Sequence, residues 1–114
     1  MTARVLPPTP ESLARAADIL RIGGLVAMPT ETVYGLACDG TNADAVACLY
    51  EAKGRPSFNP LIAHVASQAM AEREAVFSPL ARKTAEHFWP GPLTLVLTVA
   101  KTGKVCDLAR AGLD

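Results

Sequence analysis

The stretch Leu25–Leu36 reads LVAMPTETVYGL, and it joins a short apolar run to a polar turn. The run at residues 25–28 has the length and composition of a buried strand. Pro29 ends that strand, because a proline has no N–H to donate to a strand ladder. The residues after it are expected to form a loop or a turn into a second short strand. Ligands of open α/β sheets bind beyond the carboxyl ends of the strands, so this turn is a candidate binding segment.

Helices are expected to alternate with strands on both sides of this stretch. Each expected helix begins after a residue that caps helix N-termini well: Thr9, Asn42, Ser67 and Ser78. Another buried strand is expected at residues 61–65, which read LIAHV, and the clearest strand is expected at residues 93–99, which read LTLVLTV. The alternation predicts a single α/β domain over residues 1–114.

The composition restricts the class of protein. The chain has 114 residues, of which 50% are hydrophobic and 19% are charged, with a formal net charge of zero. These values indicate a packed core rather than a disordered chain, and they argue against a globally basic nucleic-acid binder. No apolar run approaches the roughly 20 residues of a membrane span. The N-terminus lacks the apolar core of a signal peptide, so the chain is expected to be cytoplasmic and not bound to a membrane.

The three cysteines, Cys38, Cys48 and Cys106, are widely spaced. No pair has C-x-x-C spacing, so neither a zinc site nor a disulfide framework is predicted. Free thiols that are buried or half-buried are the expected state.

The turn after the first expected strand is the first candidate site. Thr30, Glu31, Thr32 and Tyr34 place two hydroxyls, a carboxylate and a phenol within five positions. Such a density of hydrogen-bonding groups suits a ligand. The alternative is a capped turn in which the hydroxyls bond to the local backbone. The residues alone favour neither interpretation.

The loop KGRPSFNP, which begins at Lys53, is the second candidate. Residues 52–71 contain no acidic side chain, and Lys53 and Arg55 are cations within that stretch. Arginine offers a planar fork to phosphate oxygens and lysine a point charge, while Ser57 and Asn59 add neutral donors. The prolines restrict the backbone and reduce the entropy lost on binding. The loop therefore predicts an anion site, with a solvated basic loop as the alternative.

His64 lies in the expected strand at residues 61–65. A histidine there is more often a hydrogen-bonded structural residue, although its side chain could point into the same cleft as the basic loop. The chain contains no Walker loop, no dinucleotide-binding fingerprint and no G-x-S-x-G elbow. We assign no general acid, base or nucleophile, and no metal ligands.

Four stretches, taken in order, resemble the YrdC-like family. They are MPTETVYGL at residues 28–36, KGRP followed by NPLI within residues 53–62, HV at residues 64–65, and WPGPLT at residues 89–94. The resemblance implies a twisted open mixed sheet with flanking helices and a positively charged concave cleft. The family domain continues beyond the position of Asp114. The resemblance thus implies that the chain is the N-terminal portion of a YrdC-like domain, with an incomplete sheet.

The resemblance also implies an activity, that of an L-threonylcarbamoyladenylate synthase, a nucleotidyltransferase. Such an enzyme forms threonylcarbamoyl-AMP and pyrophosphate from L-threonine, bicarbonate and ATP, and Mg²⁺ is expected to accompany the ATP. Partner proteins of the tRNA-modification pathway then transfer the threonylcarbamoyl group to adenosine 37 of tRNA, so tRNA itself is a further candidate partner.

The family pattern implies a role for eight residues of this sequence. The residues expected to contact L-threonine are Thr32 and His64. The residues expected to bind ATP are Lys53, Arg55, Ser57 and Asn59. The residues expected to shape the pocket are Thr30 and Tyr34.

Two other functions remain open from the sequence. A non-catalytic module that binds double-stranded RNA or tRNA could use the same positive cleft, although the neutral net charge counts against it. A carbamoyl-transferring domain of hydrogenase-maturation proteins is the other, although the cysteine pairs of a zinc-finger-like segment are absent from the sequence.

Overall fold

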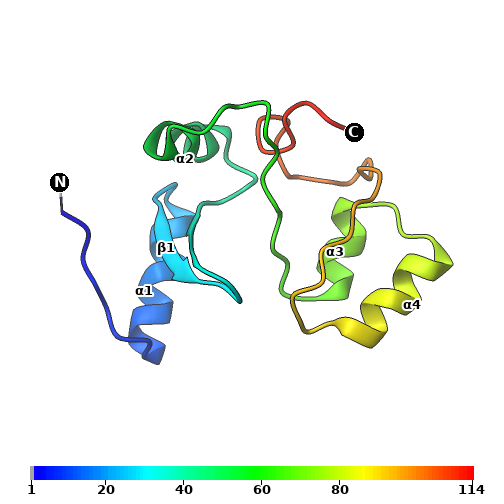
Figure 1. The fold of residues 1–114 in the computed structure, drawn as a ribbon, viewed down its shortest axis with the longest axis horizontal. Coiled ribbons are helices and arrows are strands. Elements are labelled where there is room, and N and C mark those ends of the chain that lie inside the picture. Colours follow the sequence, from blue (N-terminus) through cyan, green and yellow to red (C-terminus); the bar gives the residue numbers. More distant parts are fainter. Residues whose placement is uncertain (1) are drawn as a thin grey trace.

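The computed structural model describes residues 2–114 and contains both helices and strands. In chain order the elements are α1 (Pro10–Arg21), β1 (Val26–Pro29), β2 (Tyr34–Ala37), α2 (Ala43–Lys53), α3 (Gln68–Glu74) and α4 (Pro79–Phe88). Figure 1 shows α1 beside the β1–β2 hairpin on one side of the molecule, α3 and α4 on the other, and α2 near the C-terminal turn. The α/β class predicted from the sequence is confirmed.

The four helix starts predicted from capping residues are confirmed. The Thr9 hydroxyl accepts from the Ser12 N–H at 3.2 Å, and the Asn42 side chain accepts from two N–H groups of the first turn of α2. Ser67 and Ser78 cap α3 and α4 in the same way, each accepting one N–H at 3.1 Å. Each bond satisfies a donor that has no partner inside its helix, which is why these residue types mark the starts.

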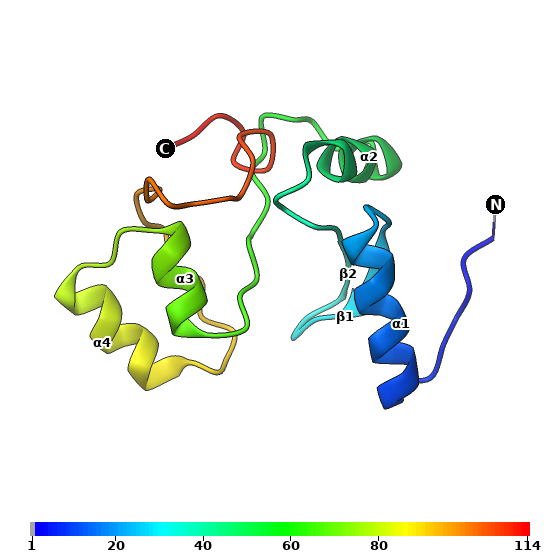
Figure 2. The ribbon, with the colours of Figure 1, turned by 180° about the vertical axis from the view of Figure 1, so that it is seen from behind.

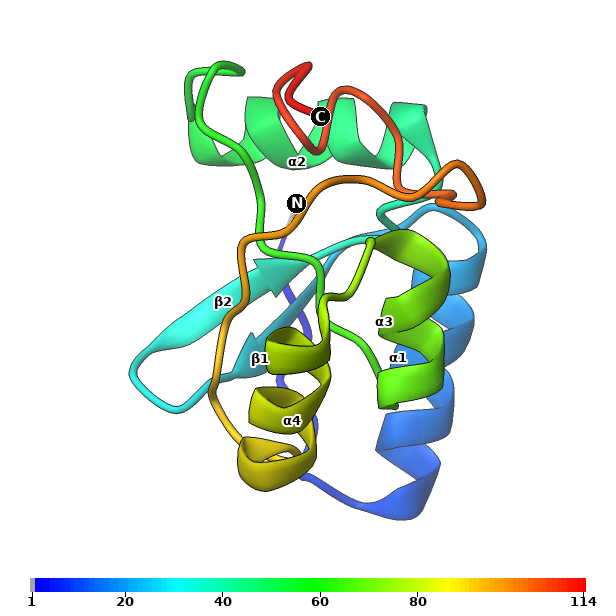
Figure 3. The same ribbon diagram turned by 90° about the vertical axis from the view of Figure 1, so that its right-hand side faces the viewer.

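The hairpin pairs β1 with β2 in antiparallel register, from Val26 opposite Ala37 to Pro29 opposite Tyr34. The prediction that the first strand is buried is wrong, because only Val26 of β1 is even half-buried. The strand also lies one residue later than expected. The physical reason is that α1 packs against β1 while the rest of the hairpin projects from the molecule (Figure 3).

The strands expected at residues 61–65 and 93–99 do not form, and the expected mixed sheet is a two-stranded antiparallel sheet in residues 2–114. In segment 93–99 the odd-numbered residues are half-buried and the even-numbered ones are exposed, as in a strand with one covered face. Its only bridge within the described chain joins Val99 to Ala75. A strand requires a neighbour to complete its ladder, and neither segment has one there.

Two hydrophobic clusters stabilise the chain. The helical-hairpin cluster contains the buried residues Ala71, Phe77, Ala81 and Ala85, with Trp89, Leu95 and Leu97 packed against it. The α2 cluster contains the buried residues Val46, Tyr50 and Ala109, with Leu61, Val105 and Leu108 packed against it. The clusters share no residue. The radius of gyration, 14.8 Å, exceeds the ~13 Å typical of about 100 residues. Seen from behind, α3 and α4 lie on one side of the molecule, and α1, the hairpin and α2 lie on the other (Figure 2).

The turn after α4 has a structural role. The Trp89 indole donates to the Leu93 carbonyl at 2.9 Å and meets the Phe77 ring edge-on, with ring centroids 6.3 Å apart. The Trp–Pro–Gly–Pro turn thereby directs segment 93–99 back across the helical-hairpin cluster.

Gly54→Ala is expected to destabilise the chain by about 1 kcal/mol, because Gly54 ends α2 in a left-handed conformation at φ 60°. A Cβ built there meets nothing within 4 Å, so the cost comes from the backbone alone. Urea unfolding measures it, with Gly40→Ala as the control, because its Cβ would make only ordinary contact, 3.9 Å from Val105, without positive φ. Equal changes in the two variants would contradict the prediction.

Candidate functional site

The basic loop of residues 53–60 begins where α2 ends. Lys53 is the last residue of α2, and Gly54 caps the helix in the left-handed conformation. The Arg55 N–H then donates to the Tyr50 carbonyl at 3.1 Å, so the backbone direction at Arg55 is set by the helix end. A tight turn follows, closed by a bond from the Asn59 N–H to the Pro56 carbonyl at 3.1 Å. The loop therefore has a defined shape.

Side chains and neighbouring segments fix this loop further. The Tyr50 hydroxyl donates to the Asn59 carbonyl at 2.6 Å, and an Arg55 Nη2 donates to the Pro60 carbonyl at 3.1 Å. The Leu61 N–H donates to the Ala109 carbonyl at 2.8 Å, which joins the end of the loop to the C-terminal turn. A loop held at both ends loses little entropy when it binds a ligand.

The cations of the loop have no acidic partner in the described part of the chain. The ion pairs there are Arg21 with Asp18, Arg82 with Glu72 and Arg110 with Asp107. Arg55 is half-buried, and among the described residues its buried Nε has no hydrogen-bond partner. A buried donor without a partner is uncommon and costs free energy, so Arg55 is well suited to an anion that would accept from it.

Thr30, Thr32 and Tyr34 lie together on the turn of the β1–β2 hairpin. The Thr30 hydroxyl donates to the Val33 carbonyl and accepts from the Thr32 N–H at 3.3 Å. This is the local capping that the sequence left open, so Thr30 shapes the turn. The Thr32 hydroxyl is exposed and lies 3.5 Å from the Thr30 hydroxyl, while Tyr34 is exposed at the start of β2. Of the two threonines of this turn, Thr32 is exposed and Thr30 is half-buried, so the Thr32 hydroxyl is the easier one for a ligand to reach.

His64 lies in the irregular segment that connects the loop to α3. Its side chain is exposed, and Nδ1 lies 3.1 Å from the Ile62 carbonyl. The eight predicted residues thus lie in three separate groups. Four are on the basic loop, three are on the hairpin turn, and His64 is alone. Within residues 2–114 no hydrogen bond or ion pair joins one group to another.

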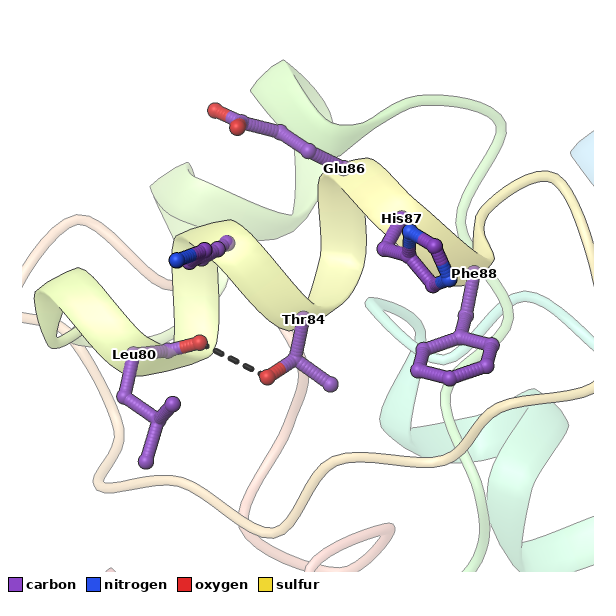
Figure 4. Close-up of a pocket in the computed structure, with 6 residues that line it drawn as sticks. Leu80, Thr84, Glu86, His87 and Phe88 are labelled. Carbon is purple, nitrogen blue, oxygen red and sulfur yellow. Dashed lines mark hydrogen bonds between the residues drawn. The ribbon is translucent and has the colours of Figure 1, made fainter.

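Two shallow hollows mark the surface. The larger, about 520 Å³, lies along one helix, α4, and none of the predicted residues lines it. Figure 4 shows Leu80, Thr84, His87 and Phe88 along it, with Glu86 directed away from His87, so these two residues form no acid–base pair. The second hollow, about 450 Å³, contains Ser57. Neither is lined by Lys53 or Arg55, so the positively charged cleft remains a prediction.

Sequence reasoning missed three contributors to the loop and its surroundings. The hydroxyl of Tyr50, a residue of α2, holds the loop. Phe58 lies exposed beside Ser57, at the second hollow. Asp107 lies across that hollow, on the C-terminal turn. Of these three, only Phe58 could have been noticed from the sequence, because it is the one aromatic residue of the loop KGRPSFNP.

The cysteines are not arranged for a metal. In the described residues no three side chains of histidine, cysteine, aspartate or glutamate cluster. Cys38 and Cys106 are half-buried, as expected, whereas Cys48 is exposed on α2, so the prediction of its burial is wrong. Burial raises the pKa of the Cys38 thiol, with smaller contributions from Cys106 and Asp39, and so keeps it in the poorly reactive protonated form.

Comparison with known proteins decides the family. Residues 18–114 match the sequence model of the Sua5–YciO–YrdC family, described as "Telomere recombination". This chain belongs to that family. Among curated Sua5–YciO–YrdC relatives, the threonylcarbamoyl-AMP synthase of Bacillus subtilis is 48% identical over 103 residues, which cover 90% of this chain and 30% of the relative. That of Pyrococcus abyssi is 50% identical over 100 residues, covering 87% of this chain and 29% of the relative.

Solved structures of family members have the same fold as this chain over most of its length. Sua5 of P. abyssi in complex with L-threonine superposes with a TM-score of 0.83 at 47% identity, over 91% of this chain and 30% of that one. A variant of the same Sua5 superposes with a TM-score of 0.84, over 91% of this chain and 32% of that one. The chain therefore spans about a third of the length of these family members. No helix in residues 2–114 is both long and apolar enough to cross a membrane.

Proposed function

We propose that this chain acts as an L-threonylcarbamoyladenylate synthase, which joins L-threonine, bicarbonate and ATP. In the proposed reaction the threonine amine attacks the carbon of bicarbonate and water leaves. An oxygen of the resulting carbamate then attacks the α-phosphorus of ATP, and pyrophosphate leaves. The products are threonylcarbamoyl-AMP and pyrophosphate, and the threonylcarbamoyl group is then passed to tRNA by partner proteins.

One observation carries the proposal: the Arg55 Nε is buried without a partner on a rigid loop that has no acid, in a chain 48% identical to a threonylcarbamoyl-AMP synthase. Charge gathers on phosphate oxygens as the carbamate attacks. Arg55 and Lys53 would stabilise that charge, while Ser57 and Asn59 would donate further hydrogen bonds. Donors that are already in place need no reorganisation when the charge develops, which is the main way such a site accelerates a reaction.

The hairpin turn and His64 are proposed to hold L-threonine. Thr32 is the exposed one of the two threonines on this turn. Because the His64 Nδ1 faces a carbonyl oxygen, the neutral ring carries its proton there, and Nε2 is left as an acceptor. Such an acceptor suits the hydroxyl or the ammonium group of an amino acid. Thr30 and Tyr34 would shape the pocket around it.

Mg²⁺ is proposed to enter as part of the Mg·ATP substrate. Magnesium ions usually keep several waters and bind through one or two carboxylates together with substrate phosphates. The acid-free stretch at residues 52–71 offers no carboxylate, so these residues do not make a magnesium site of their own. Their part is to bind the phosphates that carry the ion.

Thr32→Ala is expected to weaken L-threonine binding by about fivefold, because a factor of that size corresponds to the free energy of one hydrogen bond. ATP binding should be unchanged. Calorimetric titration of each ligand measures both affinities. Thr98→Ala is the matched control, because Thr98 is an exposed threonine of segment 93–99. An unaltered threonine affinity in Thr32→Ala would reject the role of Thr32.

The reaction itself is tested by pyrophosphate release from ATP with bicarbonate, with and without L-threonine. Release that requires both co-substrates is expected. A folded chain that binds neither ATP nor L-threonine in the titrations would show that the proposed function is wrong.

A further inference from the structure

Tyr50, near the end of α2, contacts the basic loop at two places. Its carbonyl accepts from the Arg55 N–H at 3.1 Å, and its hydroxyl donates to the Asn59 carbonyl at 2.6 Å. The residue is 6% exposed and packs in the α2 cluster. A side chain whose rotamer is fixed by packing holds its hydrogen bond in one geometry. The loop is therefore attached to a rigid support.

The hydroxyl bond fixes the chain directly before the carbonyl that holds the Arg55 side chain. The Asn59 carbonyl belongs to the peptide bond that leads into Pro60, whose ring fixes its φ. The next peptide bond is held by the Leu61 N–H, which donates to the Ala109 carbonyl at 2.8 Å. Figures 1 and 3 both show the C-terminal turn next to the chain that follows α2. Because peptide bonds are planar, the two bonds together set the direction of the Pro60 carbonyl.

The Pro60 carbonyl in turn directs the Arg55 guanidinium. Its Nη2 donates to this carbonyl at 3.1 Å, while Nε is buried without a partner among residues 2–114. The guanidinium is planar and rigid, so holding it at one nitrogen limits the directions in which the other nitrogens point. A displaced Pro60 carbonyl would therefore displace the donors that the proposed function assigns to phosphate.

We propose that Tyr50 is a positioning residue for ATP binding, which acts through the Pro60 carbonyl on the Arg55 guanidinium. This inference rests on the proposed function, because it takes Arg55 to bind phosphate. Without the Tyr50 hydroxyl, Arg55 keeps its charge and its donors, but the guanidinium is spread over more orientations. Binding must then order the guanidinium again, and the entropy lost in doing so lowers the affinity.

The test is a double-mutant cycle on Tyr50 and Arg55. Tyr50→Phe keeps the packed ring and removes only the hydroxyl. Calorimetric titration should show an ATP affinity about fivefold lower than that of the unaltered chain, a factor that corresponds to one hydrogen bond. In the Arg55→Ala background the same substitution should leave the ATP affinity unchanged, because the group through which Tyr50 acts is gone. A purely structural role would lower the affinity equally in both backgrounds.

Thr102→Val is the matched control. The Thr102 hydroxyl also donates to a backbone carbonyl, that of Arg73 at 2.6 Å, but it lies outside the basic loop. Both substitutions remove one such bond, so urea unfolding should show a loss of stability in each. Only Tyr50→Phe should also lose ATP affinity.

Each other outcome has a definite meaning. If Tyr50→Phe binds ATP as tightly as the unaltered chain, or weakens ATP binding equally with and without Arg55, the inference is wrong and the proposed function stands. The inference is also wrong if Thr102→Val lowers the ATP affinity as much as Tyr50→Phe does. If the unaltered, folded chain does not bind ATP, the proposed function falls, and this inference falls with it.

Discussion

ATP binding by the Arg55→Ala variant is expected to be roughly 30-fold weaker than by the unaltered chain. The change removes a charge-assisted hydrogen-bond donor, which is worth about 2 kcal/mol. The Arg55 Nε has no partner among residues 2–114, so its loss removes little that stabilises the fold, apart from the bond to the Pro60 carbonyl. The affinity is measured by calorimetry and folding by circular dichroism. Arg55→Lys keeps the charge but not the planar fork of the guanidinium. Its ATP affinity should therefore lie between those of the unaltered chain and Arg55→Ala.

Arg15→Ala is the control for the loss of charge. It removes the same charge from an exposed position on α1, far along the chain from the basic loop. If the two variants bind ATP equally well, the attraction is a diffuse effect of net charge, and the assignment of Arg55 is wrong. A folded Arg55→Ala chain with normal ATP affinity would reject it as well.

Phe77→Ala is expected to give the largest loss of stability, about 3–5 kcal/mol, which is the usual cost of removing a buried phenyl ring. Phe77 is 8% exposed and is the largest of the four buried residues in the helical-hairpin cluster, whose other members are alanines. The three buried alanines are too small to fill the space it leaves. Such a loss is a large part of the 5–15 kcal/mol that holds typical domains folded.

Fluorescence of the chain's one tryptophan is the appropriate measurement for Phe77→Ala. Trp89 lies edge-on to Phe77 with ring centroids 6.3 Å apart, so its emission reports this cluster during urea unfolding. Phe88→Ala, which truncates an exposed phenylalanine only one residue away from Trp89, should cost far less. Similar midpoints for the two variants would show that Phe77 does not hold the cluster together.

The helices could be predicted because their signals are local. A cap such as Asn42 bonds to the first turn of its own helix, and Gly54 ends that helix through its own φ angle. The strands depend on partners elsewhere in the chain. Segment 93–99 has the alternating exposure of a strand, yet the described residues supply no neighbour to complete its ladder. Sequence patterns therefore identify residues suited to a strand but not the pairing that makes one.

The candidate site divides in the same way. The basic loop could be predicted, because the absence of acids and the spacing of Lys53 and Arg55 are visible in the sequence. The role of Tyr50 could not, because its bond to Asn59 depends on how the chain folds back after α2. Asp107 reaches the loop's surroundings only through the fold of the C-terminal turn.

The separation of the two clusters has a consequence for how the chain opens. With no shared residue, each cluster can act as its own cooperative unit, and local opening of one need not expose the other. A nucleotide bound at the loop would contact only the unit that contains α2 and the C-terminal turn. Mass action would then slow amide exchange in that unit while α3 and α4 exchange as before. The nucleotide would thus hold one half of the chain closed and leave the other half as free to open as in its absence.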